Sequence, residues 1–513
     1  MTTHLTISNA AAVPLQAVPY VEWQDFCDWI IAECASGSRV CAFFGTPEEE
    51  MPESASLPGI PKGSIRIIAV LARPGETTLG VASSSVSHAY PSLTPLVPAL
   101  HLFERDLYEK FGVTPQGHPW LKPVRFPHAD GLRAGDAEFF AIKGDEVHEV
   151  AVGPIHAGII ECGHFRFQCV GETVLHLEIS LGYHHRGIEK ACNAGPDKRT
   201  LPVMETLAGD TTIGHTWAAC AIMEALTDAE PAPRGQMLRA ISLELERLAN
   251  HTGDIGALAG DVGFLPTSSY CGRIRGDFLN MTAAICGNRF GRGLIRPGGT
   301  AFDLDSALAD ELASRVRAGL RDLRGAADLL FSSTSATARM MGTGVVSAQA
   351  ATDIGMVGVA ARASGVRLDA RIHYPMPHMR SHDVHIATEP TGDAQARALV
   401  RFHEITESAT FAARLLENLP EGEVMARPFN AASAPHDVML APLSFSVALT
   451  EGWRGEICHV ALTDASGRFF RYAVTDPSFH NWMGLALALR DQAISDFPLC
   501  NKSFNLSYCG HDL

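Results

Sequence analysis

The sequence predicts an α+β fold in two parts: a small N-terminal α/β domain, and a larger, mainly helical domain that carries β-hairpins. Two observations predict it. Strand-like and helix-like segments alternate up to about residue 140. Beyond residue 148, three long segments have apolar residues at helical spacing, with strand-like text before and after them. A chain of 513 residues is long enough for more than one domain, and we place the two at residues 1–140 and 148–513.

The first domain contains one predicted strand and one predicted helix. Residues 64–72 (SIRIIAVLA) are rich in β-branched residues and precede a turn with Pro and Gly, so they predict a strand. The helix is predicted because apolar residues recur at helical spacing just before Gly112. These residues are Leu102, Phe103, Leu107 and Phe111. We interpret residues 125–136 (RFPHADGLRAGD) as a linker to the second domain.

The second domain opens with two strand-like runs that flank "GET" at residues 171–173, which predicts a β-hairpin or a short meander. Three helices are predicted next, because each segment has apolar residues on one face and charges elsewhere. They cover residues 234–258, 306–330 and 393–419. Strand-like text returns at residues 445–476.

Composition excludes several classes of protein. The net charge is −16, from 41 Lys and Arg against 57 Asp and Glu, which argues against nucleic acid as the main partner. No apolar run reaches the roughly 18 to 20 residues of a membrane span, and the N-terminus lacks the basic start of a signal peptide. The 12 cysteines are scattered and form no CxxC pair, which favours free thiols. We expect a cytoplasmic chain that reaches a membrane only through other subunits.

Several motifs resemble a known family. Residues 104–121 (ERDLYEKFGVTPQGHPWL) resemble the 30-kDa subunit of respiratory complex I. Later segments resemble the 49-kDa subunit and the large subunit of group 4 [NiFe] hydrogenases. They are GPIHAGIIECGHFRF, LGYHHRGIEK, ELERLANH, DVGFLP and GRGLIRPGGT. The fusion of both parts in one chain is most similar to the large subunits of hydrogenase-4 and formate hydrogenlyase. The resemblance implies a 30-kDa-like domain over 1–140 and a 49-kDa-like, hydrogenase-like domain over 148–513.

The resemblance also shows what is missing. It places the four nickel-ligand cysteines of the hydrogenases at Ala208, Thr211, Ser478 and Asn481. Alanine cannot ligate a metal, and hydroxyl or amide oxygen is a poor substitute for a bridging thiolate. Cys220 lies nine residues beyond Thr211 and cannot replace the missing ligands. We therefore expect no nickel–iron centre, no hydrogen turnover and no other metal ligand set in this chain.

Quinone reduction is the other chemistry that the resemblance implies. The His and Tyr that bind the quinone head-group in complex I fall at Ile160 and Gly209, which carry no donor side chain. A frame of polar candidates remains: the catalytic candidates Glu161, His164, His215, Asp261 and Arg454, and the lining of the vacated ligand region, Ala208, Gly209 and Ser478. Arg454 matches an arginine that overhangs the metal, and Asp261 matches the carboxylate that partners the quinone-binding His.

Other polar side chains have a plainer interpretation. Each candidate could instead be a buried polar residue that its neighbours satisfy. We favour that alternative for His156 and Arg296, and a structural or proton-path role for Glu189. Trp217 and Trp482 are interpreted as core residues. The sequence HYPMPHMRSHDVH, with His373, His378, His382 and His385, indicates a loop rather than a zinc site.

The resemblance predicts a subunit of a membrane-associated, complex I-like oxidoreductase on the inner face of the cytoplasmic membrane. It would receive electrons from a small subunit with a [4Fe-4S] cluster, dock on antiporter-like membrane subunits, and couple the electron transfer to ion translocation. It would bind no cofactor of its own, although a quinone or another carrier could accept the electrons. The alternative is a non-catalytic scaffold between the soluble and membrane arms. We expect residues 496–513 to pack into part of the vacated region, and an occupied region would favour the scaffold.

Overall fold

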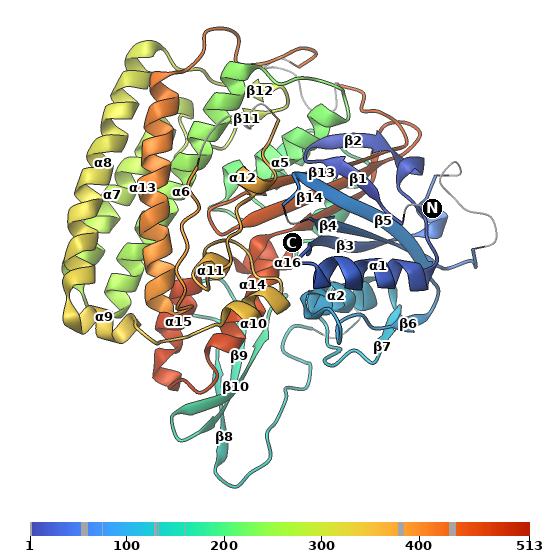
Figure 1. Cartoon of the computed structure of the whole chain (residues 1–513), viewed down its shortest axis with the longest axis horizontal. Coiled ribbons are helices and arrows are strands. Elements are labelled where there is room, and N and C mark those ends of the chain that lie inside the picture. Colours follow the sequence, from blue (N-terminus) through green and yellow to red (C-terminus); the bar gives the residue numbers. More distant parts are fainter. Residues whose placement is uncertain are drawn as a thin grey trace.

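The structure of the chain, a computed structural model, describes residues 3–52, 60–73, 75–127, 131, 133–158, 160–377, 384–429 and 438–513. Long helices lie at one side, the N-terminal domain lies at the other, and a β-hairpin protrudes between them (Figure 1). Helices and small, mostly antiparallel sheets alternate along the chain. The predicted α+β class is confirmed.

The N-terminal domain is built on a four-stranded antiparallel sheet in the order β1-β5-β4-β3. Its strands are β1 (Leu5–Ser8), β3 (Arg39–Pro47), β4 (Ile65–Ala72) and β5 (Thr78–Val86). Helices α1 (Trp23–Ala35) and α2 (His101–Phe111) share one hydrophobic core with one face of this sheet. The predicted strand and helix are therefore confirmed, and Gly112 ends α2 in the left-handed conformation, with φ of 71°.

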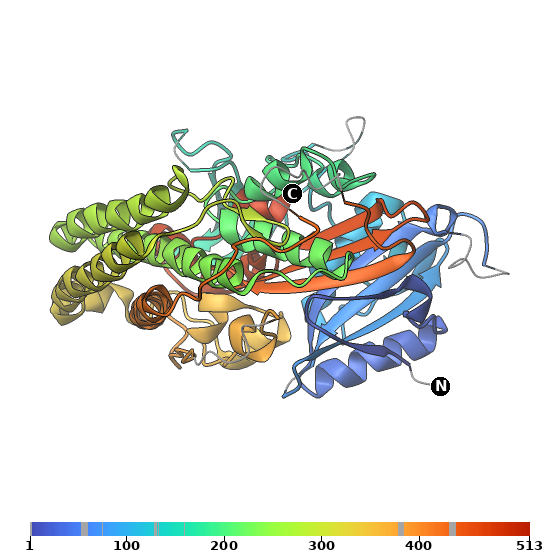
Figure 2. The same ribbon diagram turned by 90° about the horizontal axis from the view of Figure 1, so that it is seen from above.

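A second antiparallel sheet, in the order β15-β14-β13-β2, packs against the other face of the first. Its strands are β2 (Ala11–Pro14), β13 (Ser444–Glu451), β14 (Glu456–Thr463) and β15 (Phe469–Thr475). Figure 2 shows the two sheets side by side. Every residue of β4 is buried because both faces of its sheet are covered, which explains the apolar run of residues 67–72. Strand β2 comes from the first residues of the chain but completes the sheet of the second domain.

Four long helices form the bundle of the second domain (Figure 1). They are α6 (Pro233–Asp261), α7 (Leu265–Cys286), α8 (Ser306–Ser332) and α13 (Ala394–Glu417). The three predicted helices correspond to α6, α8 and α13, and the side chain of Asp393 caps the start of α13 by accepting a hydrogen bond from the amide of Ala396. Helix α5 (Thr212–Ala225) packs between this bundle and strands β13 and β14.

The protruding sheet has the order β10-β9-β8 and contains the predicted hairpin. Strands β8 (Val147–Val152), β9 (His164–Val170) and β10 (Thr173–Ser180) form it, and Gly171 makes the turn with φ of 56°. Shorter strands are β6 (Ala89–Pro91), β7 (Thr114–Gln116), β11 (Ile295–Arg296) and β12 (Gly299–Thr300). Shorter helices are α3 (Ile188–Cys192), α4 (Thr200–Glu205), α9 (Thr334–Met340), α10 (Ala348–Asp353), α11 (Gly358–Arg362), α12 (Ala370–His373), α14 (Pro477–Ala488), α15 (Phe497–Phe504) and α16 (Tyr508–Asp512).

The interpretation of residues 125–136 as a linker is wrong at its first residue. Arg125 is buried, forms an ion pair with Asp106 of α2 at 2.9 Å and donates a hydrogen bond to the main-chain oxygen of His511. The Gly and Asp residues of the stretch favoured a linker, and they gave no sign of the contacts that bury Arg125. Residues 128–130 and 132 lie outside the described residues. None of the helices that the structure describes is both long and apolar enough to cross a bilayer.

Candidate functional site

The first pair of vacated ligand positions lies on the turn before α5, where an ion pair has formed. Arg454 donates hydrogen bonds to both carboxylate oxygens of Asp210, from Nη1 at 2.7 Å and from Nη2 at 2.8 Å. Its Nη1 also lies 3.3 Å from Oγ1 of Thr211, and its guanidinium stacks on Trp453 at 3.8 Å. The indole nitrogen of Trp453 donates to the main-chain oxygen of Asp210 at 3.0 Å. Both terminal nitrogens of Arg454 are therefore bonded to this turn.

Electrostatics keep this pair charged. Burial by itself raises the pKa of Asp210, but the Arg454 guanidinium outweighs burial and holds that pKa below its usual value. Burial likewise lowers the pKa of Arg454, and Asp210 outweighs this and raises it. The side chain of Asp210 is 35% exposed, whereas that of Arg454 is 6% exposed, so the buried cation depends on the carboxylate more than the reverse.

The second pair of vacated positions lies in the first turns of α14 and is also engaged. The Ser478 hydroxyl accepts a hydrogen bond from the amide of Ser507 at 2.9 Å. The side-chain amide of Asn481 bonds both main-chain groups of Val357, at 2.9 and 3.1 Å. Together with the buried Ala208, these residues offer a metal no thiolate, and their side-chain oxygens already accept hydrogen bonds. The residues present do not fit a nickel–iron centre.

A segment near the C-terminus closes the space between the two vacated pairs. We call residues 505–512 the C-terminal segment. The main-chain oxygen of Asn505 accepts from Nε of Arg454 at 2.6 Å. The amides of Tyr508 and Cys509 donate to Oε2 of Glu161, at 3.1 and 3.4 Å. The expectation that the end of the chain packs into the vacated region is confirmed.

A line of hydrogen-bonded side chains runs inward from this segment. Oδ2 of Asp476 lies 3.0 Å from Nε2 of His215, and Nδ1 of His215 lies 3.0 Å from Nε2 of His459. Nδ1 of His459 lies 2.9 Å from the hydroxyl of Tyr472. All four side chains are buried. One proton pattern satisfies every atom with both imidazoles neutral: Tyr472 donates to His459, His459 donates to His215, and His215 donates to Asp476.

The pKa values along this line agree with that pattern. Burial, with the neighbouring His215, lowers the pKa of His459 well below its usual value. Burial raises the pKa of Asp476, but the hydrogen bonds from His215 and the amide of Ser478 and the charge of Arg454 together outweigh burial and hold that pKa below its usual value. The line therefore places an ionised Asp476 carboxylate at one end and a neutral His459 ring further in.

The comparisons with known proteins agree with this architecture. Residues 261–512 match the family model of the respiratory-chain NADH dehydrogenase 49 Kd subunit, and residues 60–131 match that of the 30 Kd subunit. The chain is a fused, complex I-like subunit related to hydrogenases. It is 29% identical to formate hydrogenlyase subunit 5 of Escherichia coli (strain K12) over 445 residues, 82% of this chain and 76% of that protein.

One further relative is a hydrogenase component, and another is an NADH-quinone oxidoreductase subunit. The protein is 26% identical to hydrogenase-4 component G of Escherichia coli (strain K12), over 82% of this chain and 75% of that protein. It is 25% identical to an NADH-quinone oxidoreductase subunit of Bdellovibrio bacteriovorus (strain HD100), over 79% of this chain and 80% of that protein. The resemblance to the large subunit of hydrogenase-4 is therefore confirmed.

The fold brings some of the predicted site residues together and leaves others apart. Glu161, Ser478 and Arg454 all bond to the C-terminal segment, and His215 joins them through Asp476, which also accepts from the amide of Ser478 at 2.7 Å. Ala208 and Gly209 belong to the same turn as Asp210. Ala208 is buried, whereas Gly209 is exposed, with open space at its Cα.

Asp261 and His164 take part in none of the hydrogen bonds described above. Asp261 is exposed at the end of α6, seven residues and about 10 Å beyond Asp254, which accepts a hydrogen bond from the side chain of Asn505 at 2.6 Å. His164 begins β9 and packs against Phe139, with ring centroids 4.9 Å apart. Its Nε2 has no hydrogen-bond partner within the described part of the chain. Ile160, at the position of the quinone-binding His, is 39% exposed.

The remaining candidates have local partners. Nε2 of His156 lies 2.9 Å from the main-chain oxygen of Gly163. Arg296 lies 3.8 Å from Glu205, and Glu189 pairs with Lys110 at 2.7 Å. Trp217 and Trp482 are each 3% exposed and belong to the hydrophobic core, as predicted. Of the predicted histidine-rich loop, His378 and His382 lie outside the described residues, and Nδ1 of His373 lies 2.9 Å from the main-chain oxygen of Asp369.

Four residues of the site were missed at the level of sequence: Asp210, His459, Tyr472 and Asp476. Three of them carried a signal. Asp210 lies between two vacated ligand positions, and Asp476 precedes a Pro-Ser pair at a helix start, where an acidic cap is common. His459 was a polar residue inside an apolar strand, which indicates a buried hydrogen-bond partner.

Proposed function

We propose that the protein is a metal-free junction, which joins the soluble and membrane arms of a complex I-like, hydrogenase-related assembly. One observation carries the proposal. The C-terminal segment occupies the space between the two vacated ligand pairs and is bonded to Glu161, Ser478 and Arg454. A metal centre or a substrate at this place would have to displace those bonds.

The partners in this proposal are an iron–sulfur small subunit with a [4Fe-4S] cluster and antiporter-like membrane subunits. The protein then lies on the inner face of the cytoplasmic membrane and is held there by those partners. Three observations support it. The relatives carry the names of subunits of larger assemblies. Large apolar side chains are exposed on the described surface, among them Ile155 at 73%, Leu265 at 67% and Leu329 at 56%. Gly209 faces open space beside the vacated positions.

A second candidate function is coupling of electron arrival to proton movement, with a quinone or another carrier as the acceptor. The buried line from Asp476 to Tyr472 favours it, because hydrogen-bonded side chains that hold one proton pattern can reverse that pattern when a nearby charge changes. Glu246 lies beside it and accepts hydrogen bonds from the amides of Ile213 and Gly214, at 2.7 and 3.4 Å. Burial raises the pKa of Glu246 to about 8, so its proton is poised near neutral pH.

One experiment tests the proposal and separates it from the second candidate. The complex is purified from its native membrane, and nickel, iron and bound quinone are measured in the same sample. A junction predicts no nickel, iron equal to the content of the partner's clusters, and an electron-transfer rate that His459→Gln leaves unchanged. A rate that falls in His459→Gln, in an assembled complex, would favour the coupling function. Stoichiometric nickel would refute both.

A further inference from the structure

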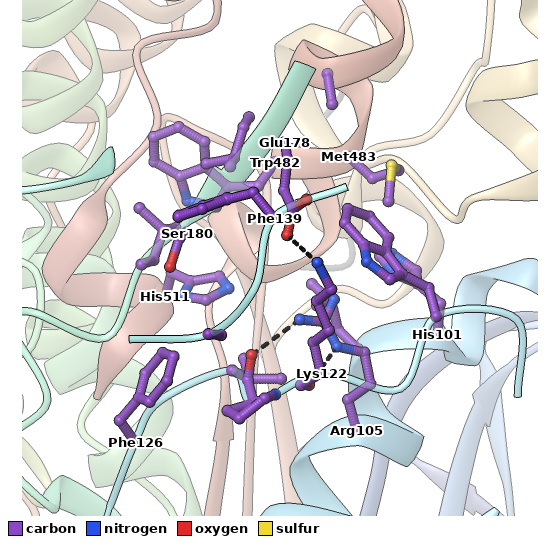
Figure 3. Close-up of a pocket in the computed structure, with 18 residues that line it drawn as sticks. His101, Arg105, Lys122, Phe126, Phe139, Glu178, Ser180, Trp482, Met483 and His511 are labelled. Atoms are coloured by element: carbon purple, nitrogen blue, oxygen red, sulfur yellow. Dashed lines mark hydrogen bonds and ion pairs between the residues drawn. The ribbon is translucent and has the colours of Figure 1, made fainter. Parts of the chain in front are cut away.

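A small cavity lies where α2 meets α14 and the C-terminal segment, and two histidines lie on opposite sides of it (Figure 3). His101 begins α2, and His511 belongs to the C-terminal segment. Both rings line the cavity, whose volume is about 50 Å³. The N-terminal domain and the C-terminal segment thus meet here through two titratable side chains.

A third histidine, His118, is held in its neutral form by its hydrogen bonds. It lies just after β7, and its Nδ1 accepts a hydrogen bond from the amide of Trp120 at 3.0 Å. Its Nε2 therefore carries the ring proton and donates to the main-chain oxygen of His101 at 3.1 Å. A main-chain amide can only donate, so a proton on Nδ1 would break the bond to Trp120. The closed arrangement therefore selects the neutral ring of His118.

The rings of His101 and His511 have little to compensate a positive charge. Within the described residues, no carboxylate forms an ion pair with the ring of His101. Nδ1 of His511 lies 2.9 Å from Oδ1 of Asp512. That carboxylate also accepts from the amides of Gly182 and His184, at 2.8 Å each, so three donors share its charge. A proton added to either ring would have no carboxylate of its own.

The other charged groups around these rings already have partners. The cations and the carboxylates that act on them are Arg105 with Glu109 and Glu178, Lys122 with Glu178, Arg125 with Asp106, and Arg39 with Glu456. The remaining carboxylates are Glu104, which accepts from the amides of Leu93 and Thr94, and Asp476, which pairs with His215. His480 of α14 also faces His101, and burial, with Arg39, lowers the pKa of His480 to about 3. Among the described residues, none of these groups is left over to balance a protonated ring.

The pKa values agree with three neutral rings in the closed form. Burial, and then the neighbouring Arg105, lowers the pKa of His101 to about 3. Burial lowers the pKa of His118, although its bond to His101 and the charge of Glu104 act in the opposite direction. Burial also lowers the pKa of His511 and outweighs Asp512. An exposed histidine titrates near 6.5, so each of these rings gains a proton more easily once this corner opens.

We propose that His101, His118 and His511 form an acid-sensitive latch, which holds the C-terminal segment closed over the vacated region at neutral pH and releases it on mild acidification. When protons bind, positive charges on His101 and His511 face each other and Arg105 across the cavity, and His118 loses its bond to Trp120. Because the closed form keeps the rings neutral, its stability is complete above roughly pH 6.5 and falls as the pH drops below that value. The latch depends on neither of the functions proposed above.

The test is hydrogen exchange of the purified full chain at about pH 7.5 and about pH 5.5, corrected for the intrinsic exchange rate at each pH. A ring whose pKa rises from about 3 to about 6.5 on opening favours the open form about tenfold over this range. His101 alone should therefore lower the protection of residues 505–512 about tenfold, and the other two rings should lower it further. Protection in α6 should not fall in parallel, because the bundle stays folded.

Two variants and one titration make the test decisive. His101→Gln removes a titrating ring and should reduce the pH effect on residues 505–512 about tenfold. His403→Gln removes a histidine that is 48% exposed on α13 and should leave the effect unchanged. If His101→Gln does not fold, exchange of the ring C2 hydrogens in the unaltered chain decides the matter, since it measures the pKa of His101 directly. A His101 ring that titrates near 6.5, an equal pH effect in His101→Gln, or a loss of protection only below about pH 5, where carboxylates titrate, would overturn the proposal.

Discussion

The ion pair of Arg454 with Asp210 should hold the vacated site closed, and its strength can be measured. Asp210→Asn keeps the size of the side chain but removes the charge that Arg454 faces. Breaking a fully buried pair from one side costs about 3 to 5 kcal/mol. The side chain of Asp210 is 35% exposed, so solvent screens part of that loss. We expect Asp210→Asn to lower the free energy of unfolding by about 2 kcal/mol.

A double-mutant cycle isolates the pair from the rest of the turn. Arg454→Gln removes the donor to Asp210 and the donor to the main-chain oxygen of Asn505. If the two side chains stabilise the fold mainly through each other, the double variant should be less destabilised than the sum of the single variants, by about 1 to 2 kcal/mol. The assay is urea unfolding of the full chain, with the midpoint compared at constant slope.

Hydrogen exchange adds the structural readout. Because Nε of Arg454 donates to Asn505, both single variants should speed amide exchange in the C-terminal segment before the chain unfolds globally. The matched control is Arg273→Gln, whose side chain is 48% exposed and pairs with Asp277 on the surface of α7, and it should change neither result. A coupling energy below about 0.5 kcal/mol, or exchange in residues 505–512 that stays at the level of the control, would refute the reasoning.

Three other outcomes follow from buried groups of the same region. Glu246→Gln should flatten the pH dependence of stability. Burial raises the pKa of Glu246 in the folded state to about 8, so between the unfolded value near 4.5 and this value the folded state keeps a proton that the unfolded state releases. The stability of the unaltered chain should therefore fall as the pH rises through that range, and the variant should lose this dependence. Urea midpoints across that range check it. His459→Phe should cost about 1 to 3 kcal/mol, because His215 and Tyr472 each lose a buried partner; thermal unfolding measures this, and an unchanged midpoint would contradict it. Ser478→Ala should cost about 1 kcal/mol in the same assay and speed exchange at Ser507, whose amide loses its acceptor.

Local patterns in the sequence were sufficient for much of the fold. The β-branched run of β4, the apolar spacing of α2 and the "GET" turn each depend on neighbours within a few residues, and each prediction is confirmed. Strand β2 could not be predicted in the same way. Its partner is more than 400 residues away, since Ala11 lies opposite Val447, and nothing within residues 11–14 names that strand.

In the site, too, local patterns could be predicted from the sequence and long-range contacts could not. The motifs predicted the vacated ligand positions from spacing within short segments, and that assignment stays a prediction. The partners of those positions come from far along the chain: Asp210 and Arg454 are 244 residues apart, and Glu161 and Tyr508 are 347 residues apart. Spacing within a motif cannot predict such pairs. Arg125 was misread for the same reason, since its ion pair and its bond to His511 are set by tertiary packing.

The predicted ligand positions and the C-terminal segment stabilise each other through shared hydrogen bonds. An arginine as buried as Arg454 needs a fixed negative charge, and Asp210 supplies it from between two of the positions that lack a thiolate. The space that a metal centre would need is then held by main-chain groups, which must themselves be satisfied. Arg454 satisfies Asn505, Ser478 satisfies Ser507, and Glu161 satisfies Tyr508. Arg454, Ser478 and Glu161 therefore each have a hydrogen-bond partner in the C-terminal segment, so none of these polar side chains needs a metal centre to satisfy it.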